Sequence, residues 1–144
     1  MLNSNSHDRY IQIEHTGDKG IKVFGNSVKE LFINAAYGMF DIMVDISNLN
    51  QNLSETIEVA ADNYEELLVT WLTELNYIFI SENKIFNKFE ISRLKNFELS
   101  GIAIGDHFDS RKREIFSEIK AVTYHELYVE QKNEKWEAQI IFDI

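Results

Sequence analysis

Two acidic residues near the two ends of the chain are the clearest candidates for chemistry. Asp18 lies within the run His15-Thr16-Gly17-Asp18-Lys19-Gly20, and Asp143 interrupts the apolar alternation of the final stretch. The flanking glycines allow the backbone to bend and to approach a ligand closely. If the two ends of the chain meet in the fold, Asp18, Asp143 and the carboxylate of Ile144 provide three hard oxygen ligands, which suit Ca²⁺ or Mg²⁺.

Hydrophobic alternation predicts the strands that must bring these acids together. On the last strand, successive side chains point to opposite faces, so Asp143 lies on the face opposite to Trp136. A hairpin turn around Gln131–Glu134 precedes that strand. The predicted strands are Tyr10–Glu14, Ile21–Phe24, Leu53–Ala60, Ile85–Ile91, Leu94–Ile104 after a turn at Ser92–Arg93, Glu118–Glu130 and Lys135–Asp143.

Two amphipathic helices separate these strands. Ser27 and Glu30 form a capping box before a helix that runs to about Val44, and Asp62 with Glu65 opens a second helix that runs to about Ser81. The stretch 105–118 is charged and irregular, which is typical of a surface loop that contacts a partner. Paired strands between helices predict an α+β fold, with mostly antiparallel sheet of about six to seven strands and both helices packed on it.

The length and composition argue against disulfide-bonded, membrane-spanning and secreted classes of protein. The length of 144 residues predicts a single domain, 1–144, with residues 1–8 loosely held. The chain has no cysteine, which excludes disulfides and thiolate metal sites. No apolar run approaches the roughly 20 residues that cross a bilayer, and the polar first residues lack the apolar centre of a secretory signal. We therefore expect a cytoplasmic protein that does not contact membranes.

The net charge of −10 opposes direct binding to nucleic acid, because affinity for phosphates comes largely from clustered lysine and arginine. An acidic surface instead favours a basic protein partner, such as an RNA-binding enzyme, whose approach it steers. The alternative is that the charge serves only to keep the protein soluble.

Three segments in register carry a family resemblance: Glu14–Ile21, Lys120–His125 and Phe142–Ile144. Together they resemble the archease family, from about Tyr10 to Ile144. Archeases are small proteins that assist the RtcB-type RNA ligase in tRNA splicing and RNA repair. The resemblance implies a metal-binding accessory factor, without catalytic activity of its own, that promotes guanylylation and multiple turnover of the ligase and meets RNA only through it. The alternative is a chaperone-like modulator of tRNA-modifying enzymes such as methyltransferases.

The resemblance also implies the site. Archeases bind a metal through the aspartates that correspond to Asp18 and Asp143, and Ile144 would add a backbone or terminal oxygen. Ca²⁺ is the expected ion, with Mg²⁺ or Mn²⁺ as alternatives. Without the resemblance, Asp18 is more typical of a turn aspartate that caps nearby amides, and the resemblance reverses that preference.

Four further residues lie in the matching segments and are candidates for orienting a carboxylate or contacting a partner: His15, Lys120, Thr123 and His125. His15 would act as a donor that orients a ligating carboxylate. The alternatives are a structural histidine at position 15, an ordinary exposed lysine, and strand residues at a sheet surface.

The chain departs from the family pattern at three positions. Gly17 replaces an alanine, Lys19 replaces an apolar residue, and Arg113 stands near the place of a histidine. These changes leave the two aspartates intact but remove any role of the replaced side chains. His107 and Asp109 lie in the same charged loop as Arg113, and we assign no catalytic role to this group.

Overall fold

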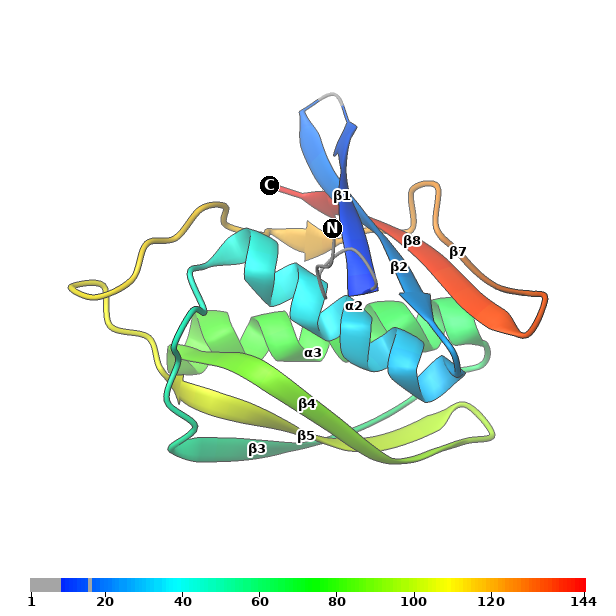
Figure 1. The fold of residues 1–144 in the computed structure, drawn as a ribbon, viewed down its shortest axis with the longest axis horizontal. Helices are drawn as coiled ribbons and strands as arrows, with labels where there is room; N and C mark the ends of the chain where they lie inside the picture. The colour runs from blue at the N-terminus through cyan, green and yellow to red at the C-terminus, as the bar shows by residue number, and fades with distance from the viewer. Residues whose placement is uncertain (1–8, 16) are drawn as a thin grey trace, which may run out of the picture.

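The computed structural model describes residues 9–15 and 17–144. The predicted loose segment 1–8 lies outside the described residues. Two antiparallel sheets form the outer layers, and the helices α2 (Val28–Met43) and α3 (Tyr64–Glu82) lie between them (Figure 1). Helix α2 contacts strands of both sheets. The predicted α+β class is confirmed, with the addition that the strands divide into two sheets on opposite sides of the helices.

The larger sheet brings together the two ends of the chain. Its strand order is β1-β2-β8-β6, with β7 also paired to β8. Strand β8 is therefore central, although it is the last strand in the chain, and β2 from the beginning of the chain lies directly beside it. The bounds are β1 Tyr10–His15, β2 Asp18–Gly25, β6 Ala121–Val122, β7 Tyr128–Lys132 and β8 Lys135–Asp143.

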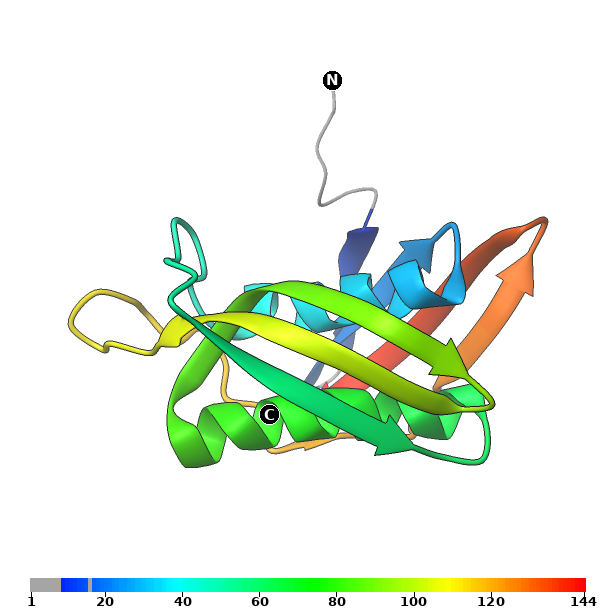
Figure 2. The same ribbon diagram turned by 90° about the horizontal axis from the view of Figure 1, so that it is seen from below.

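The smaller sheet has the order β3-β5-β4, and it lies in front of the helices in Figure 2, where the molecule is seen from below. Its strands are β3 Leu53–Ala60, β4 Lys84–Lys95 and β5 Glu98–His107. The predicted turn at Ser92–Arg93 is wrong. The chain turns at Asn96 and Phe97, which adopt φ angles of 55° and 58°. Both central residues of this tight hairpin turn are left-handed, and such turns match the twist of the strands.

Ser92 forms part of a bulge instead of a turn. The pairing of β4 with β5 shifts between Ile91 and Arg93, and shifts again between Phe86 and Lys88. Gly101 pairs with Ile91 and Gly105 pairs with Phe86, so each glycine of β5 lies opposite a bulge whose extra residue belongs to β4.

Both helices begin at capped residues. Ser27 caps α2 by accepting a hydrogen bond from the Glu30 amide, as predicted. Helix α3 is capped by Asn63, whose side chain accepts from the Glu66 amide, so the predicted start at Asp62 and Glu65 is wrong by one residue. Glu66 in turn accepts from the Asp62 amide. Neither of these described helices is long and apolar enough to cross a membrane.

The predicted strand Glu118–Glu130 is instead two short strands, β6 and β7, both paired to β8. Between them the chain turns away from the sheet: the Leu127 amide donates to the Tyr124 carbonyl, and Glu126 has a φ of 54°. The following hairpin turn, at Asn133 and Glu134, was predicted correctly.

The core lies between the two sheets and is rich in aromatic rings. Trp71 of α3 is fully buried, and its indole nitrogen donates to the Phe32 carbonyl of α2 at 3.0 Å. Phe40 of α2 contacts Phe86 and Phe89 of β4, with ring centroids 5.6 Å and 5.9 Å apart. These contacts join the two helices to each other and hold α2 against the smaller sheet.

Candidate functional site

Strand register brings the two predicted acids together at one end of the larger sheet. His15 pairs with Asp18 across the β1–β2 turn, and Ala121 of β6 pairs with Asp143. Between these pairs, Lys19 of β2 lies opposite Phe142 of β8. In an antiparallel register the next pair is then Asp18 with Asp143. Residues directly opposite each other share a face, with Cβ atoms about 5 Å apart.

The acid pair lies on the outer face of the sheet. Phe142 is fully buried and points inward, so Asp143, one residue later, points outward and is exposed, as predicted from its alternation with Trp136. Asp18 is half-buried. We name Asp18 and Asp143 the acid pair.

The strands beneath the acid pair are closely packed because Gly20 has no side chain. A Cβ at Gly20 would lie 2.7 Å from Ile141 Cδ1 and 2.9 Å from Ile13 Cγ1. The two isoleucines therefore close over the glycine on the outer face, and Ile141 is almost completely buried there. This contact holds β1, β2 and β8 together two residues from each aspartate.

Backbone contacts hold the other side of β8. The Lys120 amide donates to the Asp143 carbonyl at 2.7 Å, and both the amide and the hydroxyl of Thr123 donate to the Ile141 carbonyl. The Lys120 side chain lines a groove along α3, together with Asn76 and Ile80. Lys120 and Thr123 thus position the end of β8.

The structure describes the side chain of only one of the two predicted histidines, His125. The side chain of His15 lies outside the described part of the structure, and only its backbone pairing with Asp18 is known. His125 lies in the loop between β6 and β7, where its amide donates to the Thr123 hydroxyl and its Nε2 lies 3.3 Å from a Glu126 carboxylate oxygen. A contact of either imidazole with the acid pair remains a prediction.

The donor chemistry of the acid pair fits a hard divalent cation. Among the side chains that the structure describes, no three acidic, histidine or cysteine groups converge on one point. Asp18 and Asp143 would therefore supply two carboxylates, and a main-chain oxygen of Ile144 would supply a third ligand. Ca²⁺ binds six to eight oxygens, so such a site would leave positions for water or for groups of a partner.

Arg113 has a structural role that the sequence did not reveal. Its guanidinium donates to the carbonyls of Asp45 at 2.9 Å, Ser47 at 2.7 Å and Asn48 at 3.3 Å. The partners are far from Arg113 in the sequence, so no local pattern indicates them. Hydrogen bonds from the Ser47 hydroxyl and amide, together with the Arg113 charge, lower the pKa of the Asp45 carboxyl.

Replacing Arg113 by alanine should destabilise the fold. The change leaves three carbonyls without their charged donor, and we expect the free energy of unfolding to fall by about 2 kcal/mol. Arg111→Ala is the matched control, because the Arg111 side chain is 87% exposed and pairs only with nearby Asp109 among its described contacts. Urea denaturation measures both variants, and equal stability of the two would contradict the assigned role.

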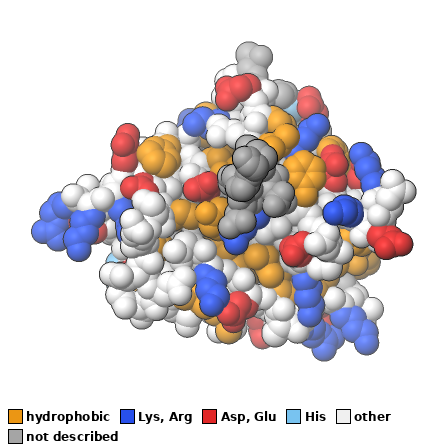
Figure 3. Space-filling model, viewed as in Figure 1, with side chains coloured by type: hydrophobic (Ala, Val, Ile, Leu, Met, Phe, Trp, Pro, Cys, Tyr) orange, Lys and Arg blue, Asp and Glu red, His pale blue; other side chains and the backbone are white. Residues whose placement is uncertain are grey.

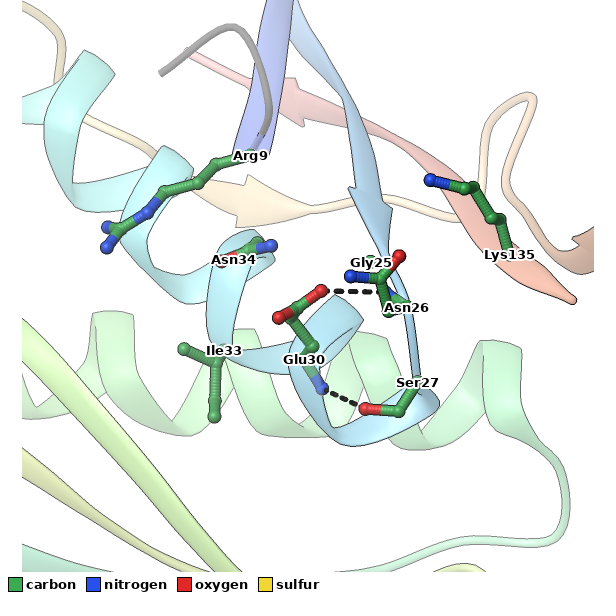
Figure 4. A pocket seen from close by; sticks show the side chains of 8 residues that line it. All are labelled: Arg9, Gly25, Asn26, Ser27, Glu30, Ile33, Asn34 and Lys135. Carbon is green, nitrogen blue, oxygen red and sulfur yellow. Dashed lines mark hydrogen bonds between the residues drawn. The ribbon is translucent and has the colours of Figure 1, made fainter. Parts of the chain in front are cut away.

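A second polar groove lies at the start of α2 and is a poor candidate site. Arg9, Asn26, Ser27, Glu30 and Lys135 line it (Figure 4). The Glu30 carboxylate accepts from the Asn26 amide at 2.7 Å, so an acid already occupies the helix N-terminus. This negative charge opposes an anionic ligand there.

The surface carries charges of both signs. Figure 3 shows acidic and basic side chains interspersed over one face, with basic groups gathered on the protruding loop after β5. That loop contains Arg111 and Lys112, and Asp109 pairs with Arg111.

Comparison with known proteins places the chain in a family. Residues 10–144 match the family model described as "Archease protein family (MTH1598/TM1083)". The "Protein archease" of Methanosarcina acetivorans is 32% identical over 140 residues, covering 94% of this chain and 96% of the relative. That of Pyrococcus furiosus is 34% identical over 135 residues, covering 91% and 95%.

Two solved structures share the fold. The solution structure of protein 1598 of Methanobacterium thermoautotrophicum has a TM-score of 0.79 and 27% identity, and the match covers 95% of this chain and 99% of that one. A Thermotoga maritima crystal structure described as "an archease, possible chaperone" has a TM-score of 0.65 and 25% identity, covering 92% and 94%.

Proposed function

Because the chain belongs to the archease family, we propose that it is a metal-binding accessory factor that activates an RtcB-type RNA ligase. The observation that supports the proposal is the pairing of Lys19 in β2 with Phe142 in β8, because one further step of this register would set Asp18 opposite Asp143. Two acids from opposite ends of the chain thus meet where a partner can reach them.

The role of the acid pair is to hold a divalent cation at a surface that docks on another protein. A bound cation neutralises phosphate charge, which is what a ligase needs when it is guanylylated again between turnovers. Asp18 and Asp143 would retain the ion, and the tightly packed strands beneath them would fix its position. The chain itself forms no covalent bond in this scheme.

Electrostatics supports a protein partner over RNA alone. With a net charge of −10, the chain repels free phosphate backbones and attracts basic surfaces. An enzyme that binds RNA presents such a surface, and its association with this chain should weaken as salt rises. RNA is then met only through the ligase.

The proposal predicts that Asp18→Asn and Asp143→Asn lose most of the stimulation of multiple-turnover RNA joining by an RtcB-type ligase. Each change keeps the size of the side chain but removes one anionic ligand. We expect at least about a tenfold loss, comparable to removal of a group that orients a ligating side chain. Glu130→Gln is the control, because Glu130 is an exposed acid of β7 in the same sheet. It pairs with Glu137 of β8, which is six residues before Asp143.

The assay also separates metal carriage from simple docking. Single-turnover joining by ligase that is already guanylylated should be unaffected by the asparagine variants. Full multiple-turnover stimulation by both variants, with folding verified by circular dichroism, would overturn the metal-carrying role.

The second candidate is a chaperone-like modulator of tRNA-modifying enzymes such as methyltransferases. The description of the Thermotoga maritima relative as a "possible chaperone" favours it. This role needs a docking surface but no metal. Capture of partners from lysate with and without chelator distinguishes the two, because only the first function predicts a ligase whose capture weakens when the metal is removed.

A further inference from the structure

Strand β1 leaves one edge of the larger sheet open. All six residues of β1 pair with β2 on one side, and no described strand pairs with its other side. The register from Tyr10–Val23 to His15–Asp18 contains no shift, and β1 contains neither proline nor lysine. Register shifts, prolines and lysines are among the features by which edge strands ordinarily resist pairing with another chain. Strand β1 lacks them.

The same edge carries an exposed apolar side chain. Ile11 is 41% exposed on the outer face. Ile13, on that face two residues later, packs over Gly20 against Ile141. A further strand beside β1 would cover Ile11 and continue this apolar row.

We propose that β1 pairs with β1 of a second copy of this chain, antiparallel and centred on Gln12. The sequence of β1 is nearly symmetric about that residue. In this register Ile11 of each copy lies opposite Ile13 of the other, and Gln12 lies opposite Gln12. Such a pairing is isologous, because each contact occurs twice about a two-fold axis.

The ends of β1 make the antiparallel orientation the favourable one. Arg9 precedes the strand, where its guanidinium lies 4.2 Å from the centre of the Tyr37 ring, and Glu14 lies near the other end. Antiparallel pairing places the cationic end of one copy beside the anionic end of the other. Parallel pairing would place like charges together.

The dimer leaves both acid pairs accessible. The turn that follows His15 begins three residues from the axis at Gln12, which is about 10 Å at 3.3 Å per residue. In the dimer, the two acid pairs therefore lie at opposite ends of the paired β1 strands, one in the sheet of each copy. A joint of five residues from each copy is small, so we expect weak, concentration-dependent association. The inference goes beyond the proposed function and does not depend on it.

A single introduced cysteine tests the register directly, because the chain has none of its own. Gln12→Cys places two thiols opposite each other across the axis and should form a disulfide-linked dimer under mild oxidation. Thr56→Cys is the matched control, since Thr56 is exposed at the centre of β3, an edge strand of the other sheet. Light scattering of the unmodified chain over a range of concentrations measures the dimer without oxidation.

Ile11→Lys provides the complementary variant. It replaces the exposed isoleucine with a charge, and we expect the dissociation constant of the dimer to rise at least about tenfold. The proposal is supported if Gln12→Cys cross-links faster than Thr56→Cys and if Ile11→Lys raises the dissociation constant of the dimer as expected. A monomer at every concentration, or equal cross-linking of the two cysteine variants, overturns it. If Ile11→Lys instead weakens only the binding of a ligase, the edge belongs to that partner and the dimer is wrong.

Discussion

Gly105→Ala is expected to be the most destabilising of the single glycine substitutions, lowering the free energy of unfolding by about 3 kcal/mol or more. A Cβ at Gly105 would lie 1.9 Å from the Ile85 carbonyl oxygen and 2.7 Å from the Phe86 Cα. Both atoms belong to the backbone of β4, so no side chain can rotate away. Relief of the clash requires β4 and β5 to separate beside the bulge at Phe86 and Lys88.

Gly17→Ala is the control for this substitution. Gly17 has a φ of 74°, but apart from its chain neighbours no atom of the described residues lies within 4 Å of where its Cβ would be. Its cost is therefore confined to backbone strain of about 1 kcal/mol. Thermal unfolding compares the two variants, and we expect a lowering of roughly 10 °C for Gly105→Ala and much less for Gly17→Ala. Equal midpoints would show that the two strands are not packed as described.

Trp71→Ala is expected to have the second large effect, a loss of about 4 kcal/mol. The indole is fully buried and meets Phe89 edge to face, with ring centroids 6.4 Å apart. A Cβ at Gly101 would lie 3.4 Å from its ring, so the ring lies directly over that glycine. Removal of the ring leaves a cavity between α3 and the smaller sheet, and it also removes the hydrogen bond to Phe32.

Trp71→Phe separates these two contributions. The smaller ring fills much of the cavity but cannot donate to the Phe32 carbonyl, so we expect an intermediate loss. Trp136→Phe is the matched control, because Trp136 is only half-buried where it packs against Tyr64. Denaturant titration followed by circular dichroism gives the free energies. The packing account fails if Trp136→Phe costs as much as Trp71→Ala.

The parts of the fold that local patterns determine were predictable. Alternation and capping in the sequence indicate both helices and most strands, because the period of apolar residues reports the period of the structure. The meeting of Asp18 with Asp143 was a condition of the predicted metal site. The Lys19–Phe142 pair leaves these two residues one step beyond it in the register of β2 and β8. The binding of a metal there remains a prediction.

The errors occurred where tertiary contacts decide the conformation. The turn was predicted at Ser92–Arg93, but Asn96 and Phe97 make it. A bulge in β4 allows the polar residues Ser92 and Arg93 to lie within the strand. Arg113 contacts carbonyls more than sixty residues earlier in the chain. Such contacts leave no periodic signal in the sequence.

The central position of β8 has a consequence for how the molecule assembles. The hairpins β1–β2 and β7–β8 are local and close early, whereas β2 and β8 come from opposite ends of the chain. Pairing between such distant segments carries the larger loop-closure cost, so we expect it to form later than the two hairpins. The two carboxylates can become neighbours only when β2 has paired with β8. If the acid pair recruits a partner as proposed, only the folded chain would do so.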